Sequence, residues 1–545
     1  MLASHSRSAR TTGVLVSVAA ISTGMIGSAP VRAVTGPDVA AGTYASVAKL
    51  NIGDRPGSRA CTAVLVDERW LATAASCFAT APGEQVPAGK PAMQSTATLS
   101  DGRTVEIAEL LPRTDRDLTL ARLATPATGI AGVRRAAAPA DVGATLTAAG
   151  FGRTRTEWVP GKLHTGAFTV DSADSTTLSS TGKGTDALCK GDTGGPLMNA
   201  SGELVAINSR SWQGGCLGTP TTEVRTGAVS ARIDDLHDWV QQARALTPGW
   251  KTETLVQAGS TLYQGIRLAD GSWTGFADVQ AKVGDIGGIR TAAAAGVDGD
   301  THVLALGGDG RIRHAIRTAQ GRWGGYGDVG AVAGVLGDVT QLSAVSIGAD
   351  LHVVAVADGR IFHTQRRADG TWSRFGDIAS VVGPLGTITH AATASVGGRL
   401  HIAAVSGGKA YHASRDSAGH WTGWGDIAQV AGDTGPLTSV TMAGAGNDTH
   451  FVIATDDGSR QYHAIRRGDG NWERFGELTD QLGGVQAKSV SAGTVDGELQ
   501  VAVTTSDNRL LHTIRHTDRT WAPTLPVATG GVTGNFGSIA ITGTL

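Results

Sequence analysis

Three short stretches in the first half of the chain hold side chains of the kind used in nucleophilic catalysis, centred on Ser76, Asp117 and Thr193. A hydroxyl group attacks a carbonyl carbon only when a neighbouring base accepts its proton. The hydroxyl of Ser76 does not titrate near neutral pH, so it does not act as that base. The three stretches therefore provide two hydroxyls and a carboxylate, but no imidazole or similar group that titrates near neutral pH and accepts the proton.

The order and surroundings of these residues resemble the chymotrypsin/trypsin-like serine peptidase family. The run T-A-A-S-C at residues 73–77 stands where the family has T-A-A-H-C, and G-D-T-G-G-P-L at residues 191–197 stands where it has G-D-S-G-G-P-L. The run D-L-T-L-A-R-L at residues 117–123 is similar to the segment that bears the triad aspartate. The resemblance covers residues 34–245 and implies an all-β serine peptidase domain, a hydrolase fold of two β-barrels.

The resemblance places Ser76, Asp117 and Thr193 at the triad positions, with Ser76 in place of histidine and Thr193 in place of serine. The family's imidazole takes the nucleophile's proton and returns it to the leaving amine. The Cβ methyl of Thr193 restricts its side chain and crowds the approach of a carbonyl carbon. Losing triad members costs roughly a million-fold in turnover. The sequence therefore predicts a pseudopeptidase; the alternatives are a remodelled site with Lys190 as base, or residual hydrolysis by another route.

Other functional positions carry over from the same resemblance. The backbone N–H groups of Gly191 and Thr193 are expected to form the oxyanion hole. The Asp192 carboxylate is expected to pair with the ammonium group of a new N-terminus at Val34. Four cysteines in an exported chain allow three disulfide pairings by number alone. The resemblance implies the pairs Cys61–Cys77 and Cys189–Cys216.

The resemblance also locates the specificity pocket, at Ala187, Ser211 and Trp212. A trypsin-type enzyme has an acid at the position of Ala187, whereas here Asp186 stands one residue earlier. We therefore expect that the pocket does not select a basic side chain as trypsin does. The cysteines lack the Cys-x-x-Cys spacing of a metal site, and we expect neither a metal nor a cofactor.

Composition and the N-terminal segment limit the class of protein. The 46 basic and 48 acidic residues give no electrostatic case for a nucleic-acid partner or an anionic membrane surface. The 77 glycines among short apolar runs indicate many tight turns between strands. Residues 1–33 combine basic residues, a short apolar run and a small-residue cleavage pattern, which predicts a secretory signal peptide and an extracellular protein without membrane insertion.

The second half of the chain, residues 249–545, is an internal repeat that follows a boundary at residues 246–249. A tryptophan recurs every 49 to 51 residues, and an arginine stands six residues before each one. Each unit contains about four short predicted strands, which is typical of a β-propeller blade. Residues 537–541 resemble the strand that the first unit lacks. The sequence therefore predicts six blades, closed by a C-terminal strand that leaves no open sheet edge.

The repeated side chains are the candidate ligand residues of the propeller. They are Arg317, Trp323, Arg366, Trp372, Arg415, Trp421, Arg466 and Trp472. The tryptophans stack on sugar rings or, as we favour, pack blade against blade. The arginines bind a ligand between blades or pair with the repeated acid of a neighbouring blade, such as Asp328. The histidines at 302, 352, 401 and 450 are interpreted as buried imidazoles rather than a metal ring. The repeats loosely resemble lectin-type propellers of the tectonin-like or fucose-lectin-like kind.

Three hypotheses about function follow. The leading one is a secreted, catalytically impaired trypsin-like peptidase homologue, a monomer that holds a peptide or protein segment in its cleft and binds a glycan or another surface ligand with its propeller. The second is an active secreted serine endopeptidase that its propeller targets. The third is a propeller lectin in which the peptidase domain is a scaffold.

Overall fold

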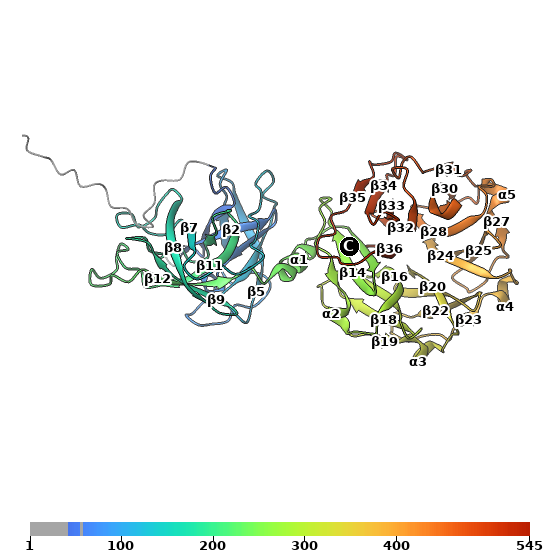
Figure 1. Cartoon of the computed structure of the whole chain (residues 1–545), viewed down its shortest axis with the longest axis horizontal. Helices are drawn as coiled ribbons and strands as arrows, with labels where there is room; N and C mark the ends of the chain where they lie inside the picture. The colour runs from blue at the N-terminus through green and yellow to red at the C-terminus, as the bar shows by residue number, and fades with distance from the viewer. Residues whose placement is uncertain (1–41, 55–57) are drawn as a thin grey trace, which may run out of the picture.

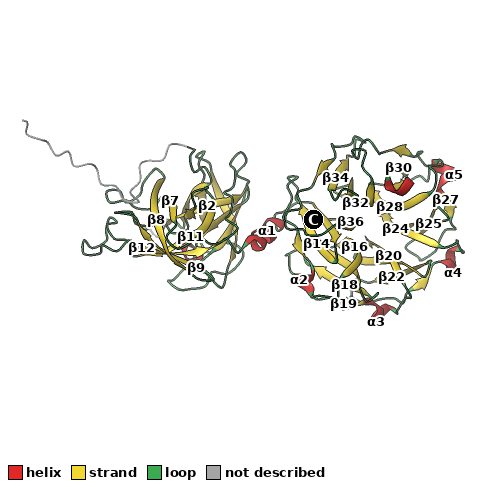
Figure 2. Cartoon of the chain, viewed as in Figure 1, coloured by secondary structure: helices red, strands yellow, loops and turns green. Residues whose placement is uncertain are grey.

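The computed structural model describes residues 42–54 and 58–545. They form two strand-rich bodies that lie side by side, with helix α1 (His237–Ala245) between them (Figure 1). Strands dominate both bodies and helices are few and short (Figure 2). The predicted signal segment and Val34 lie outside the described residues. None of the helices in the described part is long and apolar enough to cross a membrane.

The first body contains two closed barrels of six antiparallel strands each. The first barrel has the order β1-β2-β3-β6-β5-β4. Its strands are β1 (Val47–Ile52), β2 (Arg59–Asp67), β3 (Trp70–Thr73), β4 (Ser95–Thr98), β5 (Thr104–Pro112) and β6 (Thr119–Leu123). The second has the order β10-β11-β12-β9-β8-β7. Its strands are β7 (Thr145–Gly150), β8 (His164–Ala173), β9 (Thr177–Gly182), β10 (Pro196–Met198), β11 (Leu204–Ser211) and β12 (Gly227–Arg232). The predicted pair of barrels is confirmed.

Apolar side chains fill each barrel and also join the two. Leu50, Leu65 and Ile107 are buried inside the first barrel, and Leu146 and Phe168 inside the second. A third cluster lies between the barrels and includes Val64, Trp70, Ile207 and Val240. Trp70 is fully buried there. Since burying such side chains removes large apolar areas from water, this cluster holds the barrels in one arrangement.

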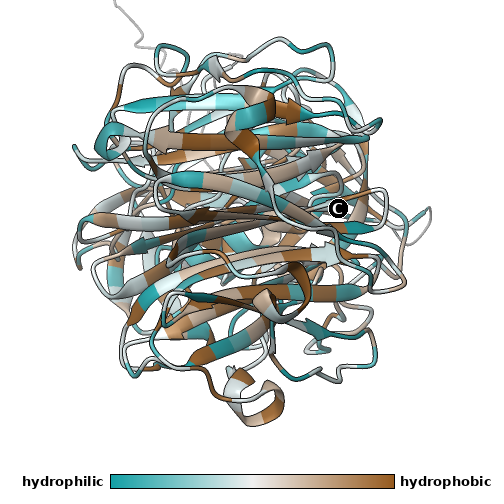
Figure 3. Cartoon of the chain, turned by 90° about the vertical axis from the view of Figure 1, so that its right-hand side faces the viewer, coloured by the Kyte–Doolittle hydropathy of each residue, from teal (hydrophilic) through white to brown (hydrophobic). Residues whose placement is uncertain are grey.

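The second body is a propeller of six four-stranded antiparallel sheets. The strands of blades 1 to 3 are β13 (Lys251–Ala258), β14 (Thr261–Arg267), β15 (Ala277–Asp278), β16 (Ile289–Val297), β17 (Asp300–Gly307), β18 (Ile312–Arg317), β19 (Gly327–Asp328), β20 (Val339–Ile347), β21 (Asp350–Ala357), β22 (Arg360–Arg366) and β23 (Gly376–Asp377). Those of blades 4 to 6 are β24 (Ile388–Val396), β25 (Arg399–Ser406), β26 (Lys409–Arg415), β27 (Gly425–Asp426), β28 (Leu437–Ala445), β29 (Asp448–Thr455), β30 (Arg460–Arg466), β31 (Gly476–Glu477), β32 (Ala487–Val495), β33 (Glu498–Thr505), β34 (Leu510–Arg515) and β35 (Leu525–Pro526). Apolar stretches run along the blade strands (Figure 3).

The last strand, β36 (Phe536–Thr544), belongs to the first blade rather than to the sixth. It pairs antiparallel with β13 along most of its length, from Lys251 opposite Thr544 to Ala258 opposite Phe536. The first blade therefore has the order β15-β14-β13-β36 and joins both ends of the propeller sequence. The predicted closure by a C-terminal strand is confirmed.

Helices outside α1 are single turns. Four of them follow the outermost strands of blades 1 to 4 and lie at the outer margin of the propeller (Figure 2). They are α2 (Gln280–Val283), α3 (Val329–Ala333), α4 (Ala379–Val382) and α5 (Ile427–Ala431). Two short 3₁₀ turns, η1 (Ala75–Cys77) and η2 (Asp456–Gly458), complete the described helices.

Helix α1 connects the barrels to the propeller through side chains on its last two turns. Arg244 forms an ion pair with Asp67 of the first barrel at 2.6 Å and donates to the carbonyl oxygen of Trp273 in the first blade at 3.0 Å. Gln241 accepts a hydrogen bond from the backbone of Gly275, and Ala245 packs on Ile266 and Leu268. The two bodies are thus in direct contact through polar and apolar groups.

Deleting residues 536–545 removes β36 and tests how closure stabilises the propeller. We expect the propeller to unfold at a temperature several degrees lower than in the full chain, because the deletion exposes sheet edges and the buried neighbours of Phe536 and Ile541. Scanning calorimetry measures the change. Deletion of the exposed Leu545 alone is the control and is expected to leave the transition in place; equal transitions in both variants would contradict the closure.

Candidate active site

The Asp117 carboxylate is the centre of the candidate site in the barrels. It accepts a hydrogen bond from the backbone N–H of Ser76 at 2.7 Å and another from the Ser76 hydroxyl at 2.8 Å. The hydroxyl of Ser209, on β11 of the second barrel, donates to the same carboxylate at 2.6 Å. Donors from both barrels therefore converge on one carboxylate, and the side chain at the first triad position is bound to it.

Two local features fix Ser76. It lies in the 3₁₀ turn η1, which directly follows β3. The disulfide Cys61–Cys77 ties the end of that turn to β2. The Ser76 side chain is exposed at the surface, while Cys77 next to it is buried. The backbone at this position is thus held by a covalent bond and by the contact with Asp117.

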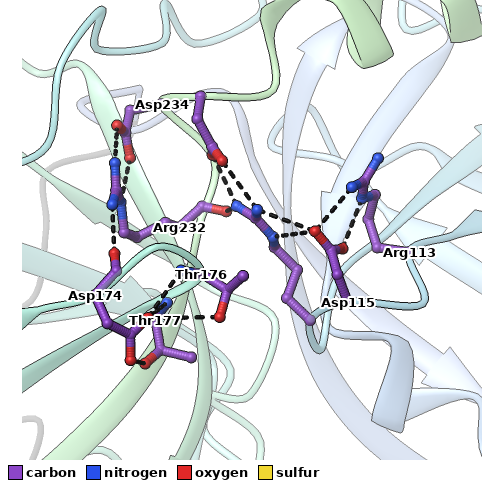
Figure 4. Close-up of polar contacts among 9 residues, drawn as sticks. Arg113, Asp115, Asp174, Thr176, Thr177, Arg232 and Asp234 are labelled. Atoms are coloured by element: carbon purple, nitrogen blue, oxygen red, sulfur yellow. Dashed lines mark hydrogen bonds and ion pairs between the residues drawn. The ribbon is translucent and has the colours of Figure 1, made fainter.

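A charged network positions the loop that carries Asp117. The guanidinium of Arg116, almost fully buried, forms an ion pair with Asp235 at 2.7 Å and donates to the carbonyl oxygen of Arg232 at 3.0 Å. Hydrogen bonds from Arg113 hold the pKa of Asp115 well below its usual range. In Figure 4, Arg232 lies between Asp234 and the backbone of Asp174, across from the Arg113–Asp115 pair. The residue just before Asp117 is therefore fastened to the second barrel.

Thr193 is held in a different hydrogen-bond pattern. Its hydroxyl donates to the carbonyl oxygen of Ser209 at 3.3 Å, and its own carbonyl oxygen accepts from the backbone N–H of Thr62 at 2.9 Å. Within the described chain no hydrogen bond joins Thr193 to Ser76 or Asp117. The structure therefore brings Ser76 and Asp117 together directly, and Thr193 joins them only through Ser209.

The turn around Thr193 keeps backbone donors available. Among the described residues, no hydrogen bond uses the N–H of Gly191 or of Thr193. Gly191 and Gly194 have φ values of 104° and 87°, a region in which glycine is favoured. A Cβ on Gly194 would lie 2.2 Å from the carbonyl oxygen of Thr62, so no other residue fits there. These features leave two unpaired N–H groups beside the Thr193 hydroxyl.

Asp192 is a buried carboxylate held by backbone donors. It is only 1% exposed and accepts hydrogen bonds from the N–H of Gly152 at 2.8 Å and of Cys189 at 2.9 Å. Burial raises its pKa to about 7. A Cβ on Gly150 or Gly152 would lie within 2.4 Å of its side chain. In the described part of the chain no cation pairs with it, and Val34, its expected partner, lies outside that part.

Two of the three predicted pocket residues, Ser211 and Trp212, line one cavity, and Ala187 packs with Cys189 and Cys216 instead. Ala187 is buried, and the Ser211 hydroxyl donates to the carbonyl oxygen of Leu188 at 2.6 Å. The exposed Trp212 ring is covered by the guanidinium of Arg225 at 3.6 Å from its centre. A cavity of about 470 Å³ lies beside Ser211 and Trp212. The Asp186 carboxylate accepts from the backbone N–H of Ala167 on β8 at 2.7 Å.

Both predicted disulfides are confirmed. Cys61 pairs with Cys77 and Cys189 pairs with Cys216, and all four are buried. The Cys189–Cys216 bond joins the segment just before Thr193 to the loop after Trp212. It therefore connects the two segments that frame the predicted pocket.

Sequence comparison with known motifs missed Ser209. The motif match selected Ser211 because it directly precedes Trp212, yet Ser209 is the serine that reaches Asp117. A β-bulge between Asn208 and Arg210 shifts the register of β11 against β12. A one-residue shift turns side chains to the other face of the strand. Because of the bulge, Ser209 faces Asp117, whereas Ser211 bonds to the carbonyl oxygen of Leu188. The signal in the sequence was a second serine two positions away.

Two joined six-stranded barrels, a carboxylate shared between them and two disulfides framing a glycine-rich turn define a serine-peptidase-type domain. Residues 33–240 match the family model described as Trypsin. This part of the chain is a trypsin-family domain, and the propeller follows it.

The propeller has a second repeated polar site, at the boundaries between blades. In blades 2 to 5 two histidines on neighbouring strands hydrogen bond to each other through Nδ1 and Nε2, at 2.9 to 3.1 Å. They are His302–His314, His352–His363, His401–His412 and His450–His463. Blade 6 has Gln500–His512 instead, at 2.6 Å. Burial lowers the pKa of His302, His352 and His401 to about 4, so these rings are neutral at pH 7.

The repeated tryptophans pack against the histidines of the preceding blade. Trp372 lies edge-on to His314 with ring centres 5.5 Å apart, and Trp421 and Trp472 contact His363 and His412 in the same way. Trp323 packs with Tyr326 against apolar residues of blades 1 and 2. These rings are therefore part of blade-to-blade packing.

The repeated acids do not form the struts considered from the sequence. Asp328 pairs with Arg311 at 3.0 Å, and Asp377 with Arg360, each within its own blade. Glu477 pairs with Arg460 at 3.1 Å in the same way. In each case the acid is on the outermost strand, and its partner is at or just before the start of the neighbouring strand of the same sheet. Each acid is thus paired within its own blade rather than with the arginine before the next tryptophan.

The buried histidine pairs predict that the propeller loses stability in acid. A histidine with a folded pKa near 4 and an unfolded pKa near 6.5 takes up protons mainly in the unfolded state, so stability falls as pH decreases from about 6.5 to 4. The fourfold variant H302Q/H352Q/H401Q/H450Q copies the Gln–His pair of blade 6. Its unfolding midpoint is expected to decrease less over this range than that of the parent, with little difference at pH 8. Parallel curves from calorimetry would contradict the assignment.

Proposed function

We propose that the trypsin-family domain is a pseudopeptidase that keeps its cleft but does not turn over peptides. The observation that carries this proposal is the hydrogen bond from the Ser76 hydroxyl to Asp117, at the place where the family has its imidazole. Asp117 thus orients a hydroxyl that neither accepts nor returns a proton at neutral pH. The histidines of the barrel domain lie on other elements: His164 begins β8, and His237 begins α1 and contacts Arg135.

The Thr193 hydroxyl supports the same proposal. Its hydrogen bond to the Ser209 carbonyl points the proton at an acceptor that does not remove it. Without a base the hydroxyl remains a poor nucleophile, and loss of the triad lowers turnover by roughly a million-fold. The unpaired N–H groups of Gly191 and Thr193 still suit a peptide carbonyl oxygen, which favours binding of a peptide or protein segment over its cleavage.

The proposal includes secretion and a ligand for the propeller. Two disulfides, all four cysteines paired, are typical of proteins in oxidising compartments and agree with the predicted N-terminal signal. The contact between α1 and the first blade joins the two bodies. When the propeller binds a ligand, the cleft of the peptidase-like domain is therefore held close to that ligand. We therefore infer that the propeller binds a glycan or another surface ligand and presents the peptidase-like domain there.

The double variant S76H/T193S restores both missing groups and tests the proposal. We expect it to cleave a peptide library that the parent leaves intact, because Asp117, Ser209 and the oxyanion donors are already in place. Mass spectrometry of the library measures cleavage. Each single variant is expected to stay inactive, since the base and the nucleophile act as a unit.

The control for this experiment is the triple variant S76H/T193S/D117N, which is expected to lose the restored cleavage because the histidine lacks its orienting carboxylate. Cleavage by the parent at the rate of the double variant would contradict the proposal. Cleavage by the triple variant at that rate would show a different catalytic route.

We also propose that the N-terminal ammonium of a chain beginning at Val34 neutralises Asp192, because a fully buried carboxylate without a counter-charge is costly. A chain that starts at Val34 is expected to unfold at a higher temperature at pH 8 than one with two added residues. D192N is expected to abolish that difference. An equal difference with and without Asp192 would contradict the pair.

A further inference from the structure

Each boundary between blades holds the arginine that stands six residues before the tryptophan. Five of them have one environment in common, and we name them the junction arginines. They are Arg267, Arg366, Arg415, Arg466 and Arg515. Each ends the third strand of its blade and lies near the His–His or Gln–His pair of the preceding blade. Burial lowers the pKa of His302 and His314, for example, and the nearby charge of Arg366 adds to that effect.

No partner in the described part of the chain satisfies the junction arginines. None of the five guanidinium groups forms a hydrogen bond or an ion pair with a described residue. All five are half-buried. None of their nitrogen atoms is among the buried polar atoms that lack a partner, so these nitrogens still reach solvent. Each therefore offers its donors to solvent at the boundary between two blades, and we call each of these five positions a slot.

The neighbouring carboxylates are engaged elsewhere. Asp270 and Glu498 attract Arg267, but Asp270 accepts hydrogen bonds from Ser272 and Glu498 pairs with His516 at 2.7 Å. For Arg515 the attracting groups are Glu473, which pairs with Arg467 and Arg519, and Asp448, which accepts from the backbone of Gly468. The positive charge at these slots is thus left without a direct counter-charge.

At the remaining junction, between blades 1 and 2, the repeated arginine has a counter-charge. Here Arg317 is only 5% exposed and lies 3.6 Å from the buried carboxylate of Glu253. Glu253 and Gln264 occupy the place of the histidine pair and bond to each other. Helix α1 covers this junction, leaving a cavity of only about 40 Å³. Among the described residues, the chain therefore supplies an ion-pair partner to the arginine at the junction that α1 covers, and to none of the other five.

We propose that the junction arginines bind the anionic groups of an acidic polysaccharide, one carboxylate or sulfate group at each of five slots. This inference rests on the proposed role of the propeller as a ligand-binding module. A guanidinium donates two parallel hydrogen bonds to a carboxylate or sulfate group. At the covered junction the Glu253 carboxylate takes the corresponding place, as an ion pair with Arg317 at 3.6 Å. Beside four of the five arginines the buried histidine pair is satisfied internally and carries no charge that would compete with the arginine for the anion.

The repetition of the slots favours a polymer over a single small anion. Five equivalent positions around one ring let several anionic groups of the same polymer bind at once, and linked weak contacts give a high overall affinity. The whole chain has a net charge of only −2, so no extended positive field exists to attract nucleic acid. Recognition depends instead on local donors at fixed positions, which matches a regularly substituted sugar polymer.

The test compares two fourfold variants of the full chain that lose the same charge. The junction variant is R366M/R415M/R466M/R515M. The matched control is R322M/R374M/R399M/R474M, which changes four exposed arginines of the same propeller that make no side-chain ion pair. Binding to polygalacturonate, dextran sulfate and unmodified dextran is measured by surface plasmon resonance, and the unfolding temperature by calorimetry.

We expect the parent and the control to bind polygalacturonate, dextran sulfate or both, and the two probes tell whether carboxylate or sulfate groups are recognised. The junction variant is expected to lose at least about 100-fold in apparent affinity at an unchanged unfolding temperature. The single substitution R415M is expected to lose about tenfold or less, and it carries the comparison if the fourfold variant unfolds.

Four outcomes would overturn the inference. Equal losses in the junction and control variants would assign the binding to net charge, and no loss in the junction variant would remove the slots from the site. Binding of unmodified dextran alone, unaffected by either variant, would keep the propeller as a ligand-binding module but reject anion recognition. Binding of none of the three polymers would overturn the inference and leave the S76H/T193S experiment to decide the pseudopeptidase proposal.

Discussion

The carboxylate of Asp117 is the constraint on which the candidate site depends, because donors from both barrels meet on it. Ser76 from the first barrel and Ser209 from the second both donate to its oxygens. The loop before it is fastened to the second barrel by the buried Arg116. In a working peptidase this geometry orients an imidazole. Here the same geometry orients the Ser76 hydroxyl, and the proposal that the domain does not turn over peptides rests on this contact.

The propeller is organised by a different constraint, the need to bury polar side chains between blades. Pairing two histidines lets each satisfy the other, and burial keeps them neutral. The tryptophan of the next blade then packs against the pair. Among the described residues, this arrangement leaves the arginine beside it without an ion-pair partner, except where Glu253 replaces the pair and pairs with Arg317. One repeated sequence pattern therefore yields five charged slots and one closed junction.

Much of this architecture was predictable from the sequence. The motifs around Thr193 and the cysteines are local, and through the family resemblance they predicted the two barrels and the disulfides. The period of 49 to 51 residues predicted the six blades. The role of Ser209 was not predictable, because a bulge in β11 decides which serine faces Asp117. The contacts of α1 with the first blade and the pairing of Glu253 with Arg317 join residues far apart in the chain, so no spacing rule reveals them.

The central claim is that the trypsin-family domain retains its site but has no activated nucleophile. Labelling of the native full-length chain with a fluorophosphonate probe tests this claim most directly, because the probe reacts only with a hydroxyl that a base has activated. The account predicts no labelling above that of the heat-denatured protein. Stoichiometric labelling of the native chain that disappears in the variant T193A would contradict it.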